Sequence, residues 1–192
     1  MKKVLICTLI LMSVLIADFA NDEYFYNAMQ VFISSNNKEF EIRKAISILS
    51  KDLRINPKNI ESLIFRAQLY SSIGEFHKAY SDINELVKIK PKSSMYQYVK
   101  CTFEESFNIS KENCIACYEK VLYLLEAELG GKKDVDIGYI FVLLLAEKPR
   151  GRELADNYIA TLTNSTIDQF NKDLLLNFDR NKFLPQKRQS DW

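Results

Sequence analysis

The chain has 192 residues, of which 47% are hydrophobic and 27% are charged, and it contains five glycines and four prolines. This composition is that of an ordinary globular protein, and the low glycine and proline contents favour helices over a sandwich of short strands. The formal net charge is +1, so the charge balance gives no indication of binding to nucleic acid or to an anionic membrane.

The first twenty residues have the pattern of a secretory signal peptide. Lys2 and Lys3 precede an apolar run from Val4 to Ile16, and Ala17 and Ala20 offer small residues at two alternative cleavage sites. The run is short for a membrane span, although an uncleaved N-terminal anchor is the alternative. We predict that residues 1–20 are a signal peptide, that the mature protein is periplasmic or secreted, and that it has no membrane anchor after cleavage.

A comparison of the chain with itself reveals a repeat, because the spacing from Pro57 to Pro91 recurs elsewhere in the sequence. Four pairs of apolar residues have this same spacing: Ala45 with Ala79, Leu49 with Ile83, Leu53 with Val87, and Ile55 with Ile89. A period of about 34 residues that contains two helices is typical of tetratricopeptide repeats.

The second copy of the repeat, residues 59–91, matches this pattern best. Ala67 and Ala79 are small, so the two predicted helices can approach closely. Gly74 permits the turn between the helices, and Pro91 ends the second one. The stretch from Tyr26 to Pro91 therefore resembles the tetratricopeptide family, which implies an all-α fold in which helix-turn-helix units stack as a solenoid.

Beyond Pro91 the pattern is weaker, but it still predicts helices. We expect one pair at Ser94–Ser106 and Lys111–Glu128, ended by Gly130, and another at Asp134–Glu147 and Gly151–Leu162, on either side of Pro149. The predicted fold is thus a solenoid of three to four helix pairs within residues 21–180.

A final amphipathic helix is expected at Thr166–Asp179. Its apolar stripe would cover the open face of the last repeat as a capping helix, and consists of Ile167, Phe170, Leu174 and Phe178. Residues 181–192 are polar and basic, and we expect them to form a flexible tail.

The resemblance also implies where a partner binds. In arrays of this family the first helices of successive units line a concave groove that holds a peptide or a helix of another protein. The residues expected to line it are Gln30, Ser34, Glu61, Ile64, Gln68, Ser71, Tyr98, Thr102 and Glu105. The convex face and the last helix are the alternative contact surfaces.

Three cysteines remain after signal cleavage. In the repeat alignment Cys101 and Cys114 occupy the two small positions where paired helices come closest, so we expect a disulfide between them in an oxidising compartment. Cys117 is the competing partner. Cys114 and Cys117 also form a C-x-x-C motif, but a thioredoxin-type site needs a strand before its helix, and a zinc site needs four ligands.

The sequence contains no phosphate-loop, dinucleotide-binding, nucleophile-elbow or zinc-protease motif. His77 is its one histidine and is expected to be a surface or capping residue. The sequence therefore favours a non-catalytic module of the bacterial periplasm that binds another protein or peptide, with no cofactor and no metal. An immunity protein that neutralises a secreted toxin is one alternative, and a thiol-disulfide enzyme that uses Cys114 and Cys117 is another.

Overall fold

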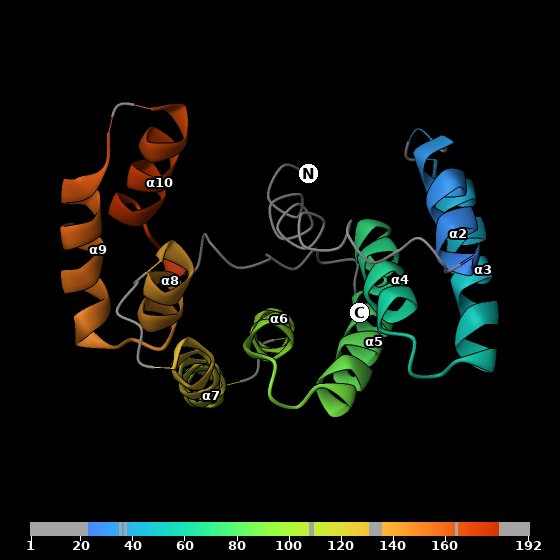
Figure 1. Cartoon of the computed structure of the whole chain (residues 1–192), viewed down its shortest axis with the longest axis horizontal. Coiled ribbons are helices and arrows are strands. Elements are labelled where there is room, and N and C mark those ends of the chain that lie inside the picture. The colour runs from blue at the N-terminus through green and yellow to red at the C-terminus, as the bar shows by residue number, and fades with distance from the viewer. Residues whose placement is uncertain are drawn as a thin grey trace. The chain divides into compact units, whose positions relative to one another are not determined.

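The computed structural model describes residues 23–34, 36, 38–107, 110–130, 136–163 and 165–180. Nine α-helices make up most of this part of the chain, and they pack mostly in sequence order as antiparallel pairs (Figure 1). The all-α prediction is thereby confirmed. None of the described helices is both long and apolar enough to cross a membrane. The predicted signal peptide at 1–20 and the predicted tail at 181–192 lie outside the described residues.

The chain divides into two compact units, one that extends to Pro91 and one that begins at Lys92. The first unit contains α2 (Glu23–Ser34), α3 (Glu39–Ile55), α4 (Ile60–Ser72) and α5 (Phe76–Ile89). The second contains α6 (Ser94–Ser106), α7 (Lys111–Leu129), α8 (Ile137–Leu145), α9 (Pro149–Thr161) and α10 (Thr166–Leu176). Within each unit every helix packs against the next, and α2 also contacts α4.

The core of the first unit is built around Phe65 of α4. Its ring lies 5.3 Å from the ring of Phe25 and 5.8 Å from that of Phe32, both on α2. Ala28 of α2 and Ala45 of α3 are completely buried, and their small side chains let these two helices approach closely. The burial of aromatic side chains between α2 and α4 therefore holds these two helices against each other.

A buried carboxylate shapes the turn between α3 and α4. Asp52 is 1% exposed and accepts hydrogen bonds from the side-chain amides of Asn56 at 3.1 Å and Asn59 at 2.7 Å. The Asn59 side-chain carbonyl oxygen in turn accepts the backbone N–H of Ser62 at 3.1 Å, which caps α4. The turn that contains Pro57 is thus fixed by one side chain of α3 and by the cap residues of α3 and α4.

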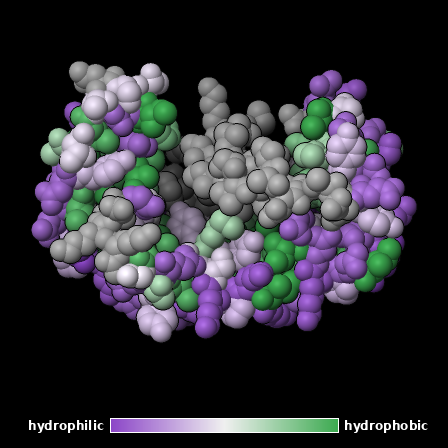
Figure 2. Space-filling model, viewed as in Figure 1, coloured by the Kyte–Doolittle hydropathy of each residue, from purple (hydrophilic) through white to green (hydrophobic). Residues whose placement is uncertain are grey.

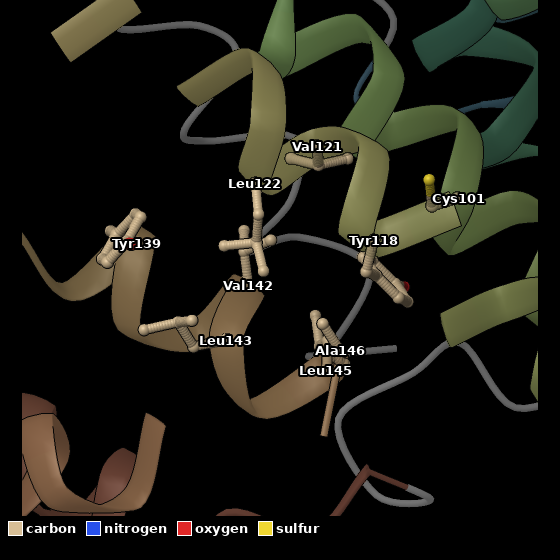
Figure 3. Packing of buried hydrophobic residues seen from close by; sticks show 9 residues of the cluster. All are labelled: Cys101, Tyr118, Val121, Leu122, Tyr139, Val142, Leu143, Leu145 and Ala146. Carbon is tan, nitrogen blue, oxygen red and sulfur yellow. The ribbon is translucent and has the colours of Figure 1, made fainter. Parts of the chain in front are cut away.

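The core of the second unit lies between α7 and α8. Figure 3 shows Leu122 and Tyr118 of α7 directed toward Val142 and Leu145 of α8, and Val121 belongs to the same buried cluster. Gly151 lets α9 lie close to α8, because a Cβ at this position would lie 3.0 Å from the Leu143 Cβ and 3.1 Å from its backbone carbon. Close packing of α9 against α8 therefore depends on a residue without a side chain.

Most helix boundaries agree with the sequence predictions. α6 spans Ser94–Ser106 as predicted, and α7 begins at Lys111 and ends at Leu129, before Gly130 with φ 57°. Gly74 also has a positive φ of 80°, as its predicted place in a turn requires. The prediction for Pro149 is wrong: this residue is the first of α9 rather than part of a linker. Proline suits that position because the first turn of a helix does not use its backbone N–H groups.

The predicted apolar stripe of the last helix is correct only in its second half. Leu174 and Phe178 pack with the fully buried Leu175 against side chains of α8 and α9, whereas Ile167 and Phe170 are 72% and 51% exposed. α10 also ends at Leu176, earlier than predicted. The described apolar cluster between α8 and α9 thus meets the C-terminal half of α10.

Candidate partner-binding surface

Six of the predicted binding residues lie in the first unit, on the neighbouring helices α2 and α4. On α2, Gln30 and Ser34 are exposed. On α4, Glu61, Gln68 and Ser71 are half-buried, whereas Ile64 is 2% exposed. The structure therefore brings these residues onto two helices that contact each other, and it leaves five of the six at least partly accessible.

The Gln68 side chain has a distinctive environment on this surface. Its amide nitrogen is buried and has no hydrogen-bond partner among the described residues. A buried donor without an acceptor is costly. The Gln68 amide nitrogen is therefore held inside the protein, although the residue as a whole is half-buried.

Hydrophilic side chains dominate the coloured surface in Figure 2, with smaller apolar areas among them. Large apolar side chains that are exposed in the first unit include Tyr26 at 55% and Ile33 at 66%, both on α2. They lie on the same helix as Gln30 and Ser34. The surface of α2 is therefore polar and apolar but almost uncharged, since Glu23 is its one charged residue.

The remaining three predicted residues lie on α6 in the second unit and are engaged within that unit. The ring of Tyr98 lies 6.1 Å from that of Tyr118. Thr102 is 8% exposed, and its hydroxyl donates to the Val99 carbonyl at 2.7 Å. Glu105 has a side chain that is 13% exposed and accepts a hydrogen bond from Arg180. Thr102 is thus buried, whereas Tyr98 and Glu105 are half-buried, and all three residues contact their own chain.

Arg180 follows α10 and reaches three other helices of the second unit. Its Nε donates to Glu105 Oε1 on α6, and its Nη1 donates to the carbonyl oxygen of Leu145, the last residue of α8, at 2.5 Å. Its guanidinium carbon lies 5.7 Å from the centre of the Tyr118 ring on α7. Sequence reasoning missed this contact, because residues 75 positions apart show no local pattern.

The electrostatics of this cluster follow from burial. Burial, together with the charge of the Glu105 carboxylate, raises the pKa of Tyr118, while Arg180 lowers it in part. The phenol therefore stays protonated at any physiological pH. Glu105 Oε2 and Arg180 Nη2 are buried and have no hydrogen-bond partner among the described residues.

The disulfide joins Cys101 of α6 to Cys117 of α7, with their Cα atoms 5.7 Å apart. The predicted pairing of Cys101 with Cys114 is therefore wrong, and the competing pairing is correct. α6 and α7 are antiparallel, with the Ser94 backbone N–H 2.9 Å from Glu128 of α7. Cys101 follows Ser94 by seven residues, so it lies level with the middle of α7. That part of α7 is closer to Cys117 than to Cys114.

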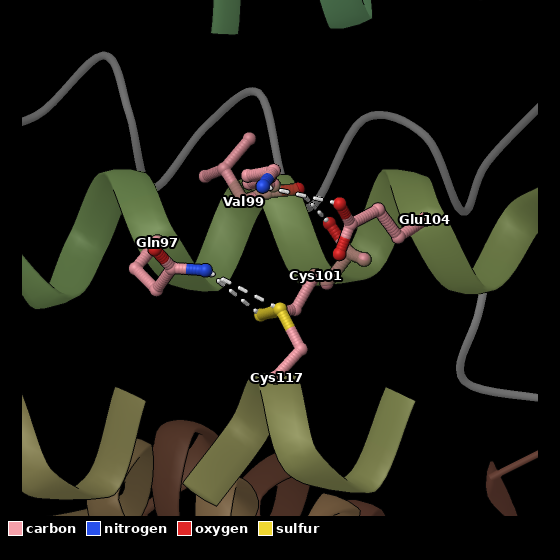
Figure 4. The surroundings of a disulfide bond; sticks show 7 residues. Gln97, Val99, Cys101, Glu104 and Cys117 are labelled. Atoms are coloured by element: carbon pink, nitrogen blue, oxygen red, sulfur yellow. Dashed lines mark hydrogen bonds and ion pairs between the residues drawn. A yellow bond between two sulfur atoms is a disulfide. The ribbon is translucent and has the colours of Figure 1, made fainter. Parts of the chain in front are cut away.

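The surroundings of the disulfide are buried and polar. Gln97 is 2% exposed, and it directs its amide nitrogen at both sulfurs, 3.3 Å from Cys117 Sγ and 3.7 Å from Cys101 Sγ (Figure 4). Cys114 keeps its thiol and is 1% exposed. Burial, followed by the charge of Glu105, raises the pKa of this thiol, which disfavours the reactive thiolate.

No group of three or more metal-ligating side chains occurs among the described residues, and His77 is exposed at the start of α5. The chain matches no protein-family model, and it matches no curated protein and no solved structure. Its role is therefore inferred from its own residues and their geometry.

Proposed function

We propose that this protein is a non-catalytic, protein-binding module of the tetratricopeptide type that works in the bacterial periplasm. The observation that carries the proposal is the register of the helices. The first residues of α4 and α6, at 60 and 94, are separated by the same number of positions as their last residues, at 72 and 106. The same shift carries the end of α3, at 55, onto the end of α5, at 89. A constant period of about 34 residues over helix-turn-helix units is typical of this family.

Two further features support a repeat. Asn59 and Ser93, which are related by the same shift, cap α4 and α6 in the same way, because each side chain accepts the backbone N–H three residues later. In a stack of such units the first helices lie side by side, and the contact of α2 with α4 agrees with this arrangement.

The same arrangement supports a role in binding. Several residues on α2 and α4 lie outside the core and are at least partly accessible to solvent. Their side chains are amides, hydroxyls and apolar groups, and few of them are charged. Such a surface suits a protein or peptide whose contact face is also mainly uncharged. Association should then depend weakly on salt, since few ion pairs are involved.

The cysteines support export rather than thiol chemistry. A disulfide between two helices persists in an oxidising compartment such as the periplasm. Cys117 is bonded to Cys101, outside the C-x-x-C motif, and the Cys114 thiol is buried with a raised pKa. A thiol-disulfide enzyme needs an accessible thiolate, so this geometry favours a structural disulfide.

The proposal is tested by finding the partner. The mature protein, immobilised by its C-terminus, is incubated with the envelope fraction of its source cells, and retained proteins are identified by mass spectrometry. The candidate is then produced separately, and its affinity is measured by calorimetry at low and high salt. The proposal predicts a saturable one-to-one complex with weak salt dependence. Failure of every retained protein to bind in isolation would contradict it.

A further inference from the structure

We propose that α2 is a self-association surface, and that it packs antiparallel against α2 of a second copy of this chain. The inference goes beyond the proposed function, because it requires no other protein. Gln30 and Ser34 belong to the same helix, so a partner that binds there competes with the second copy.

The face of α2 that points away from its own unit has the spacing of a helix-helix contact. Four exposed residues follow one another at intervals of three, four and three positions, namely Glu23, Tyr26, Gln30 and Ile33. Side chains at such intervals form one stripe along a helix, as in a coiled coil. The opposite face, which includes the completely buried Ala28, packs within the first unit against α3 and α4. The described helices of the unit therefore leave this stripe accessible to another helix.

The stripe contains two large apolar side chains on either side of an amide. Tyr26 is 55% exposed and Ile33 is 66% exposed, and Gln30 lies between them. Two copies that cross at Gln30 about a twofold axis place Tyr26 of each copy beside Ile33 of the other. The two Gln30 amides can hydrogen-bond to each other, since each has a donor and an acceptor. This arrangement therefore covers both apolar side chains and gives the central amide a partner.

The charges at the two ends of α2 favour an antiparallel second copy. Glu23 is the one charged residue of α2 and lies at its start, whereas Lys38 is exposed just beyond its end. Antiparallel packing brings Glu23 of each copy toward Lys38 of the other. The next residue, Glu39, already pairs with Arg43 at 2.7 Å. A parallel arrangement would instead bring the two Glu23 carboxylates together, where they repel.

The length of α2 limits the strength of this association. Its 12 residues form a helix about 18 Å long, which is short for the roughly 800 Å² per partner that a stable dimer buries. We therefore expect a reversible dimer with a Kd of about 10 to 100 µM.

Sedimentation velocity of the mature protein over about a hundredfold range of concentration measures this Kd. Tyr26→Asp should raise it at least about tenfold. Ile167→Asp is the matched control and should leave it unchanged, because Ile167 is 72% exposed on α10. A monomer throughout the range, or an equal effect of the two substitutions, would overturn the proposal.

A charge exchange tests the ends of the contact. Glu23→Lys places two cations together at each end and should raise the Kd, and adding Lys38→Glu should restore it to the wild-type value. If the double variant dimerises no better than Glu23→Lys alone, the antiparallel pairing is wrong.

Disulfide crosslinking tests the orientation separately. In a Cys114→Ala background, Tyr26→Cys and Ile33→Cys proteins are oxidised with copper phenanthroline, alone and as a mixture. Antiparallel packing predicts that the mixture crosslinks most, through one copy of each. Equal crosslinking of each protein alone would contradict it. These measurements involve no other protein, so the absence of a binding partner would contradict the proposed function alone.

Discussion

Arg66 of α4 and Asp82 of α5 form an ion pair with two hydrogen bonds, with Nε 2.9 Å from Oδ2 and Nη2 2.6 Å from Oδ1. The third nitrogen donates to the hydroxyl of Ser50 on α3 at 3.0 Å. A single side chain therefore joins three helices of the first unit. The side chain of Asp82 is 5% exposed and that of Arg66 is 19% exposed, so water does little to screen the pair.

Removal of the cation from this pair should be costly. Arg66→Met leaves the Asp82 carboxylate buried without its partner, and we expect a loss of about 3 kcal/mol in the free energy of unfolding, measured with urea. The exposed pair of Lys88 with Glu85 provides the control, because Lys88→Met should cost less than about 1 kcal/mol. Equal effects of the two substitutions would contradict the assigned role of Arg66.

The disulfide should stabilise the second unit. It links residues 16 positions apart, so Cys101→Ser or Cys117→Ser should lower the free energy of unfolding by about 3 kcal/mol. Cys114→Ala should cost less, since it leaves the bond intact. Iodoacetamide added to the denatured, unreduced protein should label Cys114, as located by fragmentation of the tryptic peptide that also contains Cys117. Label on Cys117 would show the other pairing.

Gly151 should tolerate no side chain. Gly151→Ala places a methyl group 3.0 Å from Leu143 Cβ and 3.1 Å from the backbone of α8, and we expect a loss of about 1 to 3 kcal/mol by urea unfolding. Gly138→Ala is the control, because its new methyl group meets a carboxylate oxygen of the Asp136 side chain at 3.3 Å. A stability of Gly151→Ala equal to that of the control would show that α8 and α9 can move apart.

Glu75 should make stability depend on pH. The ammonium of Lys78 and the guanidinium of Arg43, 2.8 Å and 2.6 Å from its oxygens, lower the pKa of Glu75. A carboxyl with a lowered folded pKa stabilises the protein above its unfolded value of about 4.3, and this contribution is lost as the pH falls through the folded value.

Glu75→Gln should therefore be about 0.5 to 1 kcal/mol less stable than the wild type at neutral pH. The two proteins should converge as the pH falls below about 4. Urea unfolding at a series of pH values measures the difference. A difference that persists unchanged in acid would mean that Glu75 acts through packing rather than charge.

The helices of this protein follow from local rules, and the sequence therefore predicts them well. The helix ends near Gly74, Pro91 and Gly130 depend on residues close together in the chain. The boundary at Pro149 was wrong because proline can begin a helix as well as separate two helices. The half-exposed α10 shows what hydrophobic periodicity does not predict. An apolar stripe predicts that one face of a helix is buried, but not how much of that face the neighbouring helices cover.

The site depends on long-range geometry, which the sequence shows less well. The choice between Cys114 and Cys117 depends on the level at which α6 and α7 face each other, and residues three apart on a helix differ little in direction. The contact of Arg180 with Glu105 spans 75 positions of the chain and has no sequence signal at all. The sequence predicted that Glu105 lines a partner-binding groove, and it did not show that Arg180 of the same chain contacts this residue.

The most direct test of a partner-binding surface on α2 is a charge scan with matched controls. Gln30→Arg with Ser34→Arg places two cations on α2, and Ser47→Arg with Ser81→Arg places two on exposed positions of α3 and α5. Retention of the partner from the envelope fraction is measured for each variant after its helix content has been checked by circular dichroism. We predict that the α2 variant loses at least about tenfold in affinity and that the control binds as the wild type does. Equal retention by both variants would contradict the proposed surface.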